Sequence, residues 1–145
     1  MSPLLVLLSF LLTSGPAMAE APAPPAGPAS NRPASPLEGT WRNTRDTIHI
    51  RADRCGPALC GTVISAAVRH QTDVRQGTGR GLVGMRLFTG FRPAGASTWK
   101  GQIYIPDLDQ SATGKIVLTD PNSITVSGCL LFGLACKTQH WKRIG

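Results

Sequence analysis

Two histidines and two aspartates are the residues of this chain whose types and spacing could support chemistry. His49 and His140 could form a two-histidine metal site if an early strand and a late strand met in the fold. Asp107 and Asp109 could act as a carboxylate pair in acid–base catalysis or calcium binding. Both pairs have a simpler explanation, because the histidines fall opposite the apolar positions of their strands and the aspartates belong to a turn. We therefore predict no catalytic residue and no metal ligand.

The N-terminal residues predict export from the cytoplasm. An apolar run at residues 4–12 precedes a group of small residues, and Ala17 and Ala19 fit the positions before a signal-peptidase cut. The run is much shorter than the ~20 apolar residues of a membrane-spanning helix. We expect a cleaved signal peptide over residues 1–19, with cleavage near Ala19, and no transmembrane segment in the mature chain.

Composition divides the remainder of the chain into a leader and one domain. Pro, Ala, Gly and Ser make up nearly all of residues 20–36, which predicts a disordered leader, and residues 37–145 are expected to fold as one domain. The net charge of +7 is dispersed and forms no basic run. In an exported protein, this charge favours an anionic envelope component or a membrane surface as the partner. We predict no nucleic-acid partner.

Four cysteines in an exported domain are typical of two disulfides, for which the sequence allows three pairings. We favour Cys55–Cys60 and Cys129–Cys136, because each pair brackets a turn-like segment. A zinc site is the alternative, but neither pair has the two-residue spacing that such sites prefer. Oxidised cysteines cannot act as thiolate nucleophiles, so the disulfide interpretation also disfavours cysteine catalysis.

Alternation of apolar and polar residues predicts short β-strands through the folded region. Ile48 and Ile50, for example, alternate with polar side chains. No segment has helical spacing, and residues 69–81 are expected to form an exposed loop. The pattern predicts an all-β fold, a single antiparallel, roughly eight-stranded, up-and-down β-barrel. After an opening segment at 37–41, the expected strands are 47–52, 61–68, 82–91, 98–105, 112–119, 123–129 and 138–144.

Aromatic residues are the candidate lining of a ligand site in such a barrel. The mouth of a β-barrel is a favoured site for a small apolar ligand. The same side chains could instead fill the core, which a short barrel needs in any case. Within the strand 82–91, strict alternation places Phe88 and Phe91 on opposite faces. The candidate lining residues are Trp41, Phe91, Trp99 and Trp141.

Several short motifs follow one another in a fixed order along the folded region. They are Gly39-Thr40-Trp41, Ile48-His49-Ile50, Cys55-Gly56-Pro57-Ala58-Leu59-Cys60-Gly61, Leu82-Val83-Gly84-Met85, Gly90-Phe91-Arg92-Pro93, Trp99-Lys100-Gly101-Gln102-Ile103-Tyr104, Ser127-Gly128-Cys129 and Thr138-Gln139-His140-Trp141-Lys142-Arg143. This ordered set resembles a bacterial exported family catalogued as domain of unknown function twenty-one forty-seven. The resemblance covers residues 37–145 and implies a small lipocalin-like β-barrel with no settled activity. The lipocalin likeness also implies that Trp41 stacks beneath Arg143 where the barrel closes.

Together these patterns predict a periplasmic or secreted β-barrel that is monomeric, holds no cofactor and binds rather than catalyses. Its expected ligand is a small hydrophobic or amphipathic molecule, or an anionic envelope component. One alternative is an envelope structural or interaction protein with a solid barrel. Another is a hydrolase of an envelope polymer, which would need a buried carboxylate or histidine with a shifted pKa in a cleft.

Export is testable by intact mass. We expect the periplasmic form to begin near Glu20, because signal peptidase cuts after small residues such as Ala19. A periplasmic protein whose mass still includes residues 1–19 would contradict the predicted cleavage.

Overall fold

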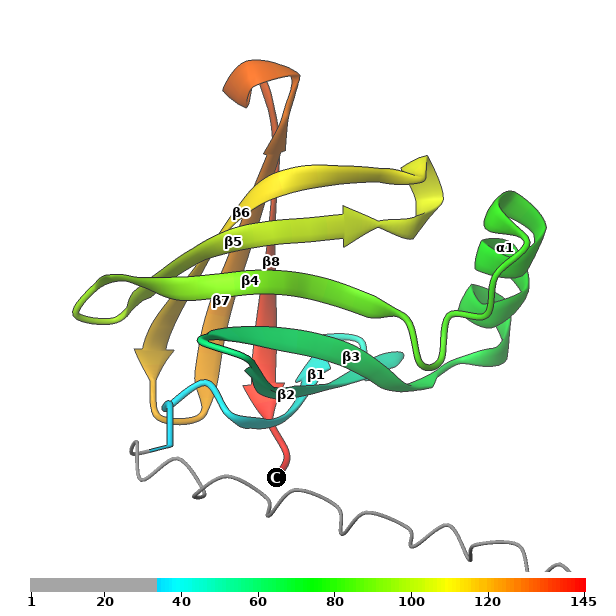
Figure 1. The fold of residues 1–145 in the computed structure, drawn as a ribbon. Helices are drawn as coiled ribbons and strands as arrows, with labels where there is room; N and C mark the ends of the chain where they lie inside the picture. The colour runs from blue at the N-terminus through cyan, green and yellow to red at the C-terminus, as the bar shows by residue number, and fades with distance from the viewer. Residues whose placement is uncertain (1–33) are drawn as a thin grey trace, which may run out of the picture. The chain divides into compact units, whose positions relative to one another are not determined.

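A computed structural model describes residues 34–145 of the chain, which form a closed, antiparallel, eight-stranded β-barrel with one α-helix (Figure 1). Each strand pairs with the next in sequence, and the last pairs with the first, which confirms the predicted up-and-down barrel. The predicted signal peptide, residues 1–19, and residues 20–33 of the predicted leader lie outside the described residues. The strands are β1 (Gly39–Asn43), β2 (Ile48–Cys55), β3 (Ala58–Ala66), β4 (Arg86–Gly95), β5 (Thr98–Ile105), β6 (Gln110–Asp120), β7 (Ser123–Leu130) and β8 (Ala135–Arg143).

Three short helical segments connect these strands. Helix α1 (Val68–Thr78) lies between β3 and β4, and the 3-10 turns η1 (Pro106–Leu108) and η2 (Leu131–Gly133) join β5 to β6 and β7 to β8. Both disulfides lie at strand ends, where Cys55–Cys60 braces the β2–β3 hairpin and Cys129–Cys136 braces the β7–β8 hairpin. These are the two pairings that the turn-like segments favoured.

Helix α1 corrects the prediction that residues 69–81 form an exposed loop. Its sequence is polar, and Val74 is its one buried side chain, so it has no apolar stripe from which sequence spacing could reveal a helix. Hydrogen bonds near its two ends hold the helix in place instead. The Gln71 amide donates to the Ala66 carbonyl, and Gly79 caps the C-terminus in the left-handed conformation. Among residues 34–145, no helix is both long and apolar enough to cross a bilayer.

Strand β4 corrects the prediction that Phe88 and Phe91 face opposite ways. Both side chains are buried in the core, although residues three apart lie on opposite faces of a regular strand. A β-bulge accounts for this, because the register with β5 shifts between Thr89 and Arg92. Gly90 lies within the bulge with a φ of 67°, which glycine adopts without the penalty of a side chain. The additional residue brings Phe91 back to the interior.

Closure of the barrel depends on a short seam between β1 and β8. Only three residue pairs join these strands: Trp41 with Arg143, Arg42 with Lys142, and Asn43 with Trp141. The Arg143 guanidinium lies over the fully buried Trp41 indole, 4.2 Å from the ring centroid. It also donates to backbone carbonyls of three residues: Pro121 at 3.0 Å, Glu38 at 2.7 Å and Pro36 at 2.5 Å. Arg143 therefore ties the entry to β1 to the β6–β7 turn.

We expect Arg143→Met to lower the free energy of unfolding by about 2–4 kcal/mol, because it removes the stacking and three charged hydrogen bonds together. Arg143→Lys should recover less than half of the loss, since an ammonium lacks the planar fork of donors. Urea denaturation followed by tryptophan fluorescence measures both values. Arg92→Met, at an exposed position on β4, is the matched control. Equal stability of the Arg143→Met variant and the wild type would refute this role.

Candidate functional site

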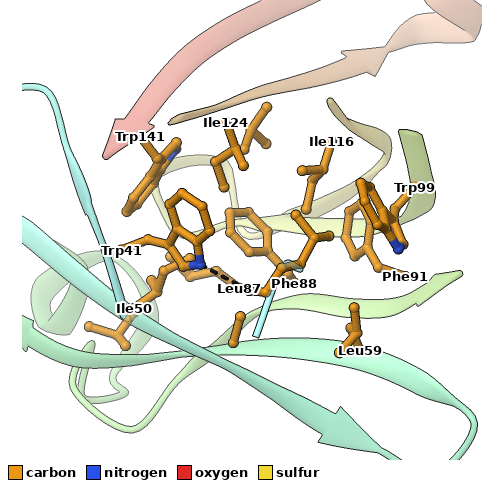
Figure 2. Packing of buried hydrophobic residues seen from close by; sticks show 14 of the residues in the cluster. Trp41, Ile50, Leu59, Leu87, Phe88, Phe91, Trp99, Ile116, Ile124 and Trp141 are labelled. Atoms are coloured by element: carbon orange, nitrogen blue, oxygen red, sulfur yellow. Dashed lines mark hydrogen bonds between the residues drawn. The ribbon is translucent and has the colours of Figure 1, made fainter. Parts of the chain in front are cut away.

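The barrel interior is filled by the aromatic residues that the sequence suggested as a ligand lining. Trp41, Phe91, Trp99 and Trp141 are all buried, with at most 5% of any of them exposed (Figure 2). Phe88 packs edge-to-face on two of them, with centroid distances of 5.8 Å to Phe91 and 6.0 Å to Trp141. These contacts form the core of the barrel.

Little space remains between these side chains. An interior cavity of about 20 Å³ is lined entirely by carbon-rich side chains and backbone, including Trp41, Ile50 and Phe91. This volume accommodates about one water molecule. A Cβ atom on Gly101 would lie 2.7 Å from a ring carbon of Phe91, so even the glycines on the inner wall leave no slack. The interior as it stands does not have room for a small organic ligand.

The indole groups of Trp41 and Trp141 differ in their hydrogen bonding. The Trp41 Nε1 donates to the Leu37 carbonyl at 2.9 Å, a bond drawn as the dashed line in Figure 2, and this bond ties the segment before β1 to the core. The Trp141 Nε1 is buried and has no acceptor among residues 34–145. An unpaired buried donor costs about 1–3 kcal/mol. It is the polar feature of the interior that the packing does not satisfy.

A shallow groove at the rim of the barrel, largely open to solvent, has a volume of about 580 Å³. It lies between the connection from α1 to β4 and the end of β5. Its walls are chemically mixed, because Arg80 and Arg86 carry positive charge while Val83 and Met85 are apolar. Val83 is exposed, and Met85 is half-buried against the core. The groove therefore presents cationic and apolar groups side by side.

Three side chains from separate segments form a polar network at one edge of this groove. Arg80 follows α1, Tyr104 lies near the end of β5, and Asp109 follows η1. The Arg80 guanidinium donates to the Tyr104 hydroxyl at 2.5 Å and to the Asp109 carboxylate at 3.1 Å. The Tyr104 hydroxyl in turn donates to the same Asp109 oxygen at 2.5 Å. The network links the end of α1 to the β5–β6 turn and fixes the position of Arg80.

The second arginine of the groove has no such partner. No acidic side chain in the described part of the chain forms an ion pair with Arg86. One carboxylate, Asp109, therefore opposes two guanidinium groups, and the groove retains a net positive charge. A carboxylate, sulfate or phosphate group is the chemistry that a free guanidinium recognises best.

The family of the chain is now clear. A family model described as "Uncharacterized protein conserved in bacteria (DUF2147)" matches residues 39–143. The chain belongs to the DUF2147 family. Its matched region includes every strand of the barrel, so the expected resemblance is confirmed over the folded domain.

Comparison with solved structures places the fold of this DUF2147 protein beside the lipocalins. Protein HP1028 from the human pathogen Helicobacter pylori, described as belonging to the lipocalin family, superposes with a TM-score of 0.60. The two chains are 14% identical, and the match covers 75% of this chain and 83% of the other. At this identity the likeness concerns the fold alone. A search of curated proteins finds no match.

The histidines and aspartates suggested by the sequence lie at separate places in the DUF2147 barrel. His49 Nε2 lies 2.6 Å from the Asp46 carboxylate, and His140 Nδ1 lies 3.2 Å from the Thr125 hydroxyl. Within residues 34–145, no group of three or more His, Cys, Asp or Glu side chains is arranged to hold a metal ion. Asp109, which the sequence suggested as a turn residue, joins the network with Arg80.

Sequence reasoning missed Arg80 and Tyr104 as functional candidates. Arg80 falls within residues 69–81, for which the sequence predicts only an exposed loop, and Tyr104 falls near the end of the predicted strand 98–105. One available signal was that Tyr104 is the single tyrosine of the chain and directly precedes the turn that contains Asp109. The approach of Arg80 could not be inferred, because it depends on where α1 ends.

The network raises the pKa of Tyr104 above its usual value of about 10. The main cause is the hydrogen bond to Asp109, which favours the protonated hydroxyl, while the Arg80 charge opposes the shift. Because the pKa of Tyr104 is higher in the folded state, its hydrogen bond to Asp109 stabilises the fold at every pH below the pKa of tyrosine in the unfolded chain. Its contribution is lost as the pH rises through the folded-state pKa.

We expect the absorbance at 295 nm to titrate with a pKa above that of free tyrosine, a signal that is unambiguous because Tyr104 is the only tyrosine. Asp109→Ala should lower this pKa, because it removes both the acceptor and the nearby negative charge. Asp107→Ala, a substitution in the same turn, is the control and should leave the pKa unchanged. An unshifted pKa in the wild type would show that the network does not form in solution.

Proposed function

We propose that this protein is exported to the periplasm and binds a small anionic amphiphile in the rim groove, without converting it chemically. The DUF2147 family is bacterial, the structure has two disulfides, and the sequence begins with a predicted signal peptide. The disulfides and the predicted signal peptide support an oxidising compartment outside the cytoplasm, which in a bacterium is the periplasm or the exterior. The lipocalin-like fold is compatible with a binding role, but the filled interior leaves only the rim for a small ligand.

One observation carries the choice of site: the groove offers about 580 Å³ and the interior cavity about 20 Å³. A ligand in the groove would meet the Arg86 guanidinium with its anionic group and would lie along Val83 and Met85 with its apolar part. Arg80, already held by Tyr104 and Asp109, would contribute a second, oriented donor. Binding at the rim leaves the core aromatics in place, whereas binding among Trp41, Phe91, Trp99 and Trp141 would require them to repack.

Isothermal titration with dodecyl phosphate, below its critical micelle concentration, tests this proposal. Arg86→Gln should weaken binding about tenfold, the usual effect of losing one charge-assisted hydrogen bond. Gly81→Phe should weaken it further by filling the groove. A Cβ atom at residue 81 would lie 3.7 Å from its nearest neighbour, the Arg75 guanidinium, so a side chain can begin there without a clash.

Two controls make the result specific. Arg92→Gln removes a positive charge from β4 outside the groove and should leave the affinity unchanged. Binding of neutral dodecyl maltoside should not respond to Arg86→Gln, because that ligand has no anionic group. Equal affinity of wild type, Arg86→Gln and Gly81→Phe for dodecyl phosphate would eliminate the groove as the site.

A second candidate function, that of an envelope interaction protein with a solid barrel, is favoured by the filled interior. Native mass spectrometry of protein purified from its own cell envelope separates the two. A bound small molecule supports the binding protein, and a mass equal to that of the chain alone supports the interaction protein.

A further inference from the structure

The β7–β8 hairpin ends in a strongly exposed apolar segment, here called the apolar tip, which consists of residues 131–134. Leu131 is 69% exposed, Phe132 is fully exposed and Leu134 is 87% exposed. Figure 1 shows this end of the hairpin projecting beyond the strands beside it. The last β7–β8 pair, Leu130 with Ala135, lies beyond the last pairing between β6 and β7. The tip therefore stands clear of the barrel.

The tip is held in shape without help from the barrel core. Cys129 and Cys136 are directly opposite each other in the ladder, and their disulfide closes the base of the tip. Leu131 and Phe132 both have left-handed backbone conformations, with φ of 52° and 56°, which disfavour residues that carry a Cβ atom. Full exposure of Phe132 means that packing within the barrel does not compensate for this cost. A strained, braced and exposed apolar segment is typical of an interaction surface.

The dimensions of the tip fit a lipid interface better than a protein partner. Phe132 is three steps along the chain from Cys129, so the tip extends at most about 10 Å beyond the bridge. Apolar groups of interfacial membrane proteins enter the bilayer by a similar depth, about 5–10 Å. A stable protein interface needs about 20–30 residues on each side, far more than the three large side chains of the tip.

The charge of the hairpin is complementary to anionic lipid head groups. Residues 121–145 contain no acidic residue, and Lys137 is the basic residue nearest the tip. Lys137 directly follows the bridged Cys136 and is exposed. A lysine one residue from the base of an inserted tip can reach the head-group layer with its flexible side chain. The net charge of +7 for the whole chain acts in the same direction.

We propose that the apolar tip inserts into the interfacial layer of an anionic phospholipid bilayer and holds the barrel at a membrane surface. Leu131, Phe132 and Leu134 enter the boundary between head groups and acyl chains, and Lys137 contacts the head groups. The disulfide keeps the tip extended, so little conformational entropy is lost on insertion. This role does not depend on ligand binding in the rim groove.

Flotation of the exported protein with vesicles of equal parts phosphatidylglycerol and phosphatidylcholine tests the proposal. The combined substitution Leu131→Ser, Phe132→Ser and Leu134→Ser should reduce membrane partitioning at least about 100-fold, because each large apolar side chain contributes on insertion. A matched triple variant, Ile64→Ser, Val68→Ser and Leu108→Ser, removes exposed apolar residues elsewhere and should partition like the wild type. Lys137→Gln should weaken binding to these vesicles but not to pure phosphatidylcholine vesicles.

A spectroscopic readout locates the tip directly. Phe132→Trp should give blue-shifted emission that brominated lipids quench, whereas the three native tryptophans are buried and should not respond. Flotation of the tip variant at wild-type levels, or an unquenched tryptophan at position 132, would overturn the proposal. So would a tip-dependent dimer in light scattering without vesicles, because a second copy of the chain would then be the partner.

Discussion

The barrel depends on the stacking of one cation on one indole at its seam. β1 and β8 share only three residue pairs, a short ladder for two strands that must complete a closed sheet. Arg143 strengthens this ladder by covering Trp41 and by binding carbonyls from two other segments. Trp41 in turn donates to the Leu37 carbonyl, so the segment that enters β1 is tied to the buried core. Without this seam, the aromatic core would have an open side.

The filled core determines where function can reside. An eight-stranded barrel is just wide enough either to be packed by side chains or to hold one small ligand. Here four large aromatic side chains and Phe88 occupy the interior, and the cavity that remains is the size of a water molecule. The similarity to a lipocalin therefore concerns the arrangement of the eight strands. It does not extend to a hollow interior. The two proposed roles therefore rest on surfaces outside the core, the rim groove and the apolar tip.

Most strands of the barrel could be predicted from local patterns, but the bulge in β4 and helix α1 could not. Alternation over short segments is read from neighbouring residues, so β5 was placed correctly from Thr98 to Ile105. The bulge in β4 breaks that alternation, because Gly90 adds a residue whose effect depends on pairing with β5. Helix α1 lacks an apolar face, so the spacing of its side chains does not reveal it, and its ends are marked only by the Gln71–Ala66 hydrogen bond and the Gly79 cap. The rim groove was missed for a different reason, because Arg80, Tyr104 and Asp109 come from three segments.

The sequence by itself indicated the all-β class and the family, because alternation is read from neighbouring residues and the family from an ordered set of motifs. It favoured the turn-bracketed disulfide pairs among three possible pairings, and the structure decided between them. Only the tertiary structure decided whether the interior is hollow, which side chains meet at the rim, and how far the β7–β8 tip projects. These properties depend on the volume enclosed by eight strands and on distances between segments far apart in the chain. His49, His140 and Asp107, the residues whose types first suggested chemistry, acquired no shared site in the fold. Arg80 and Tyr104, which had suggested none, were brought together by the end of a helix.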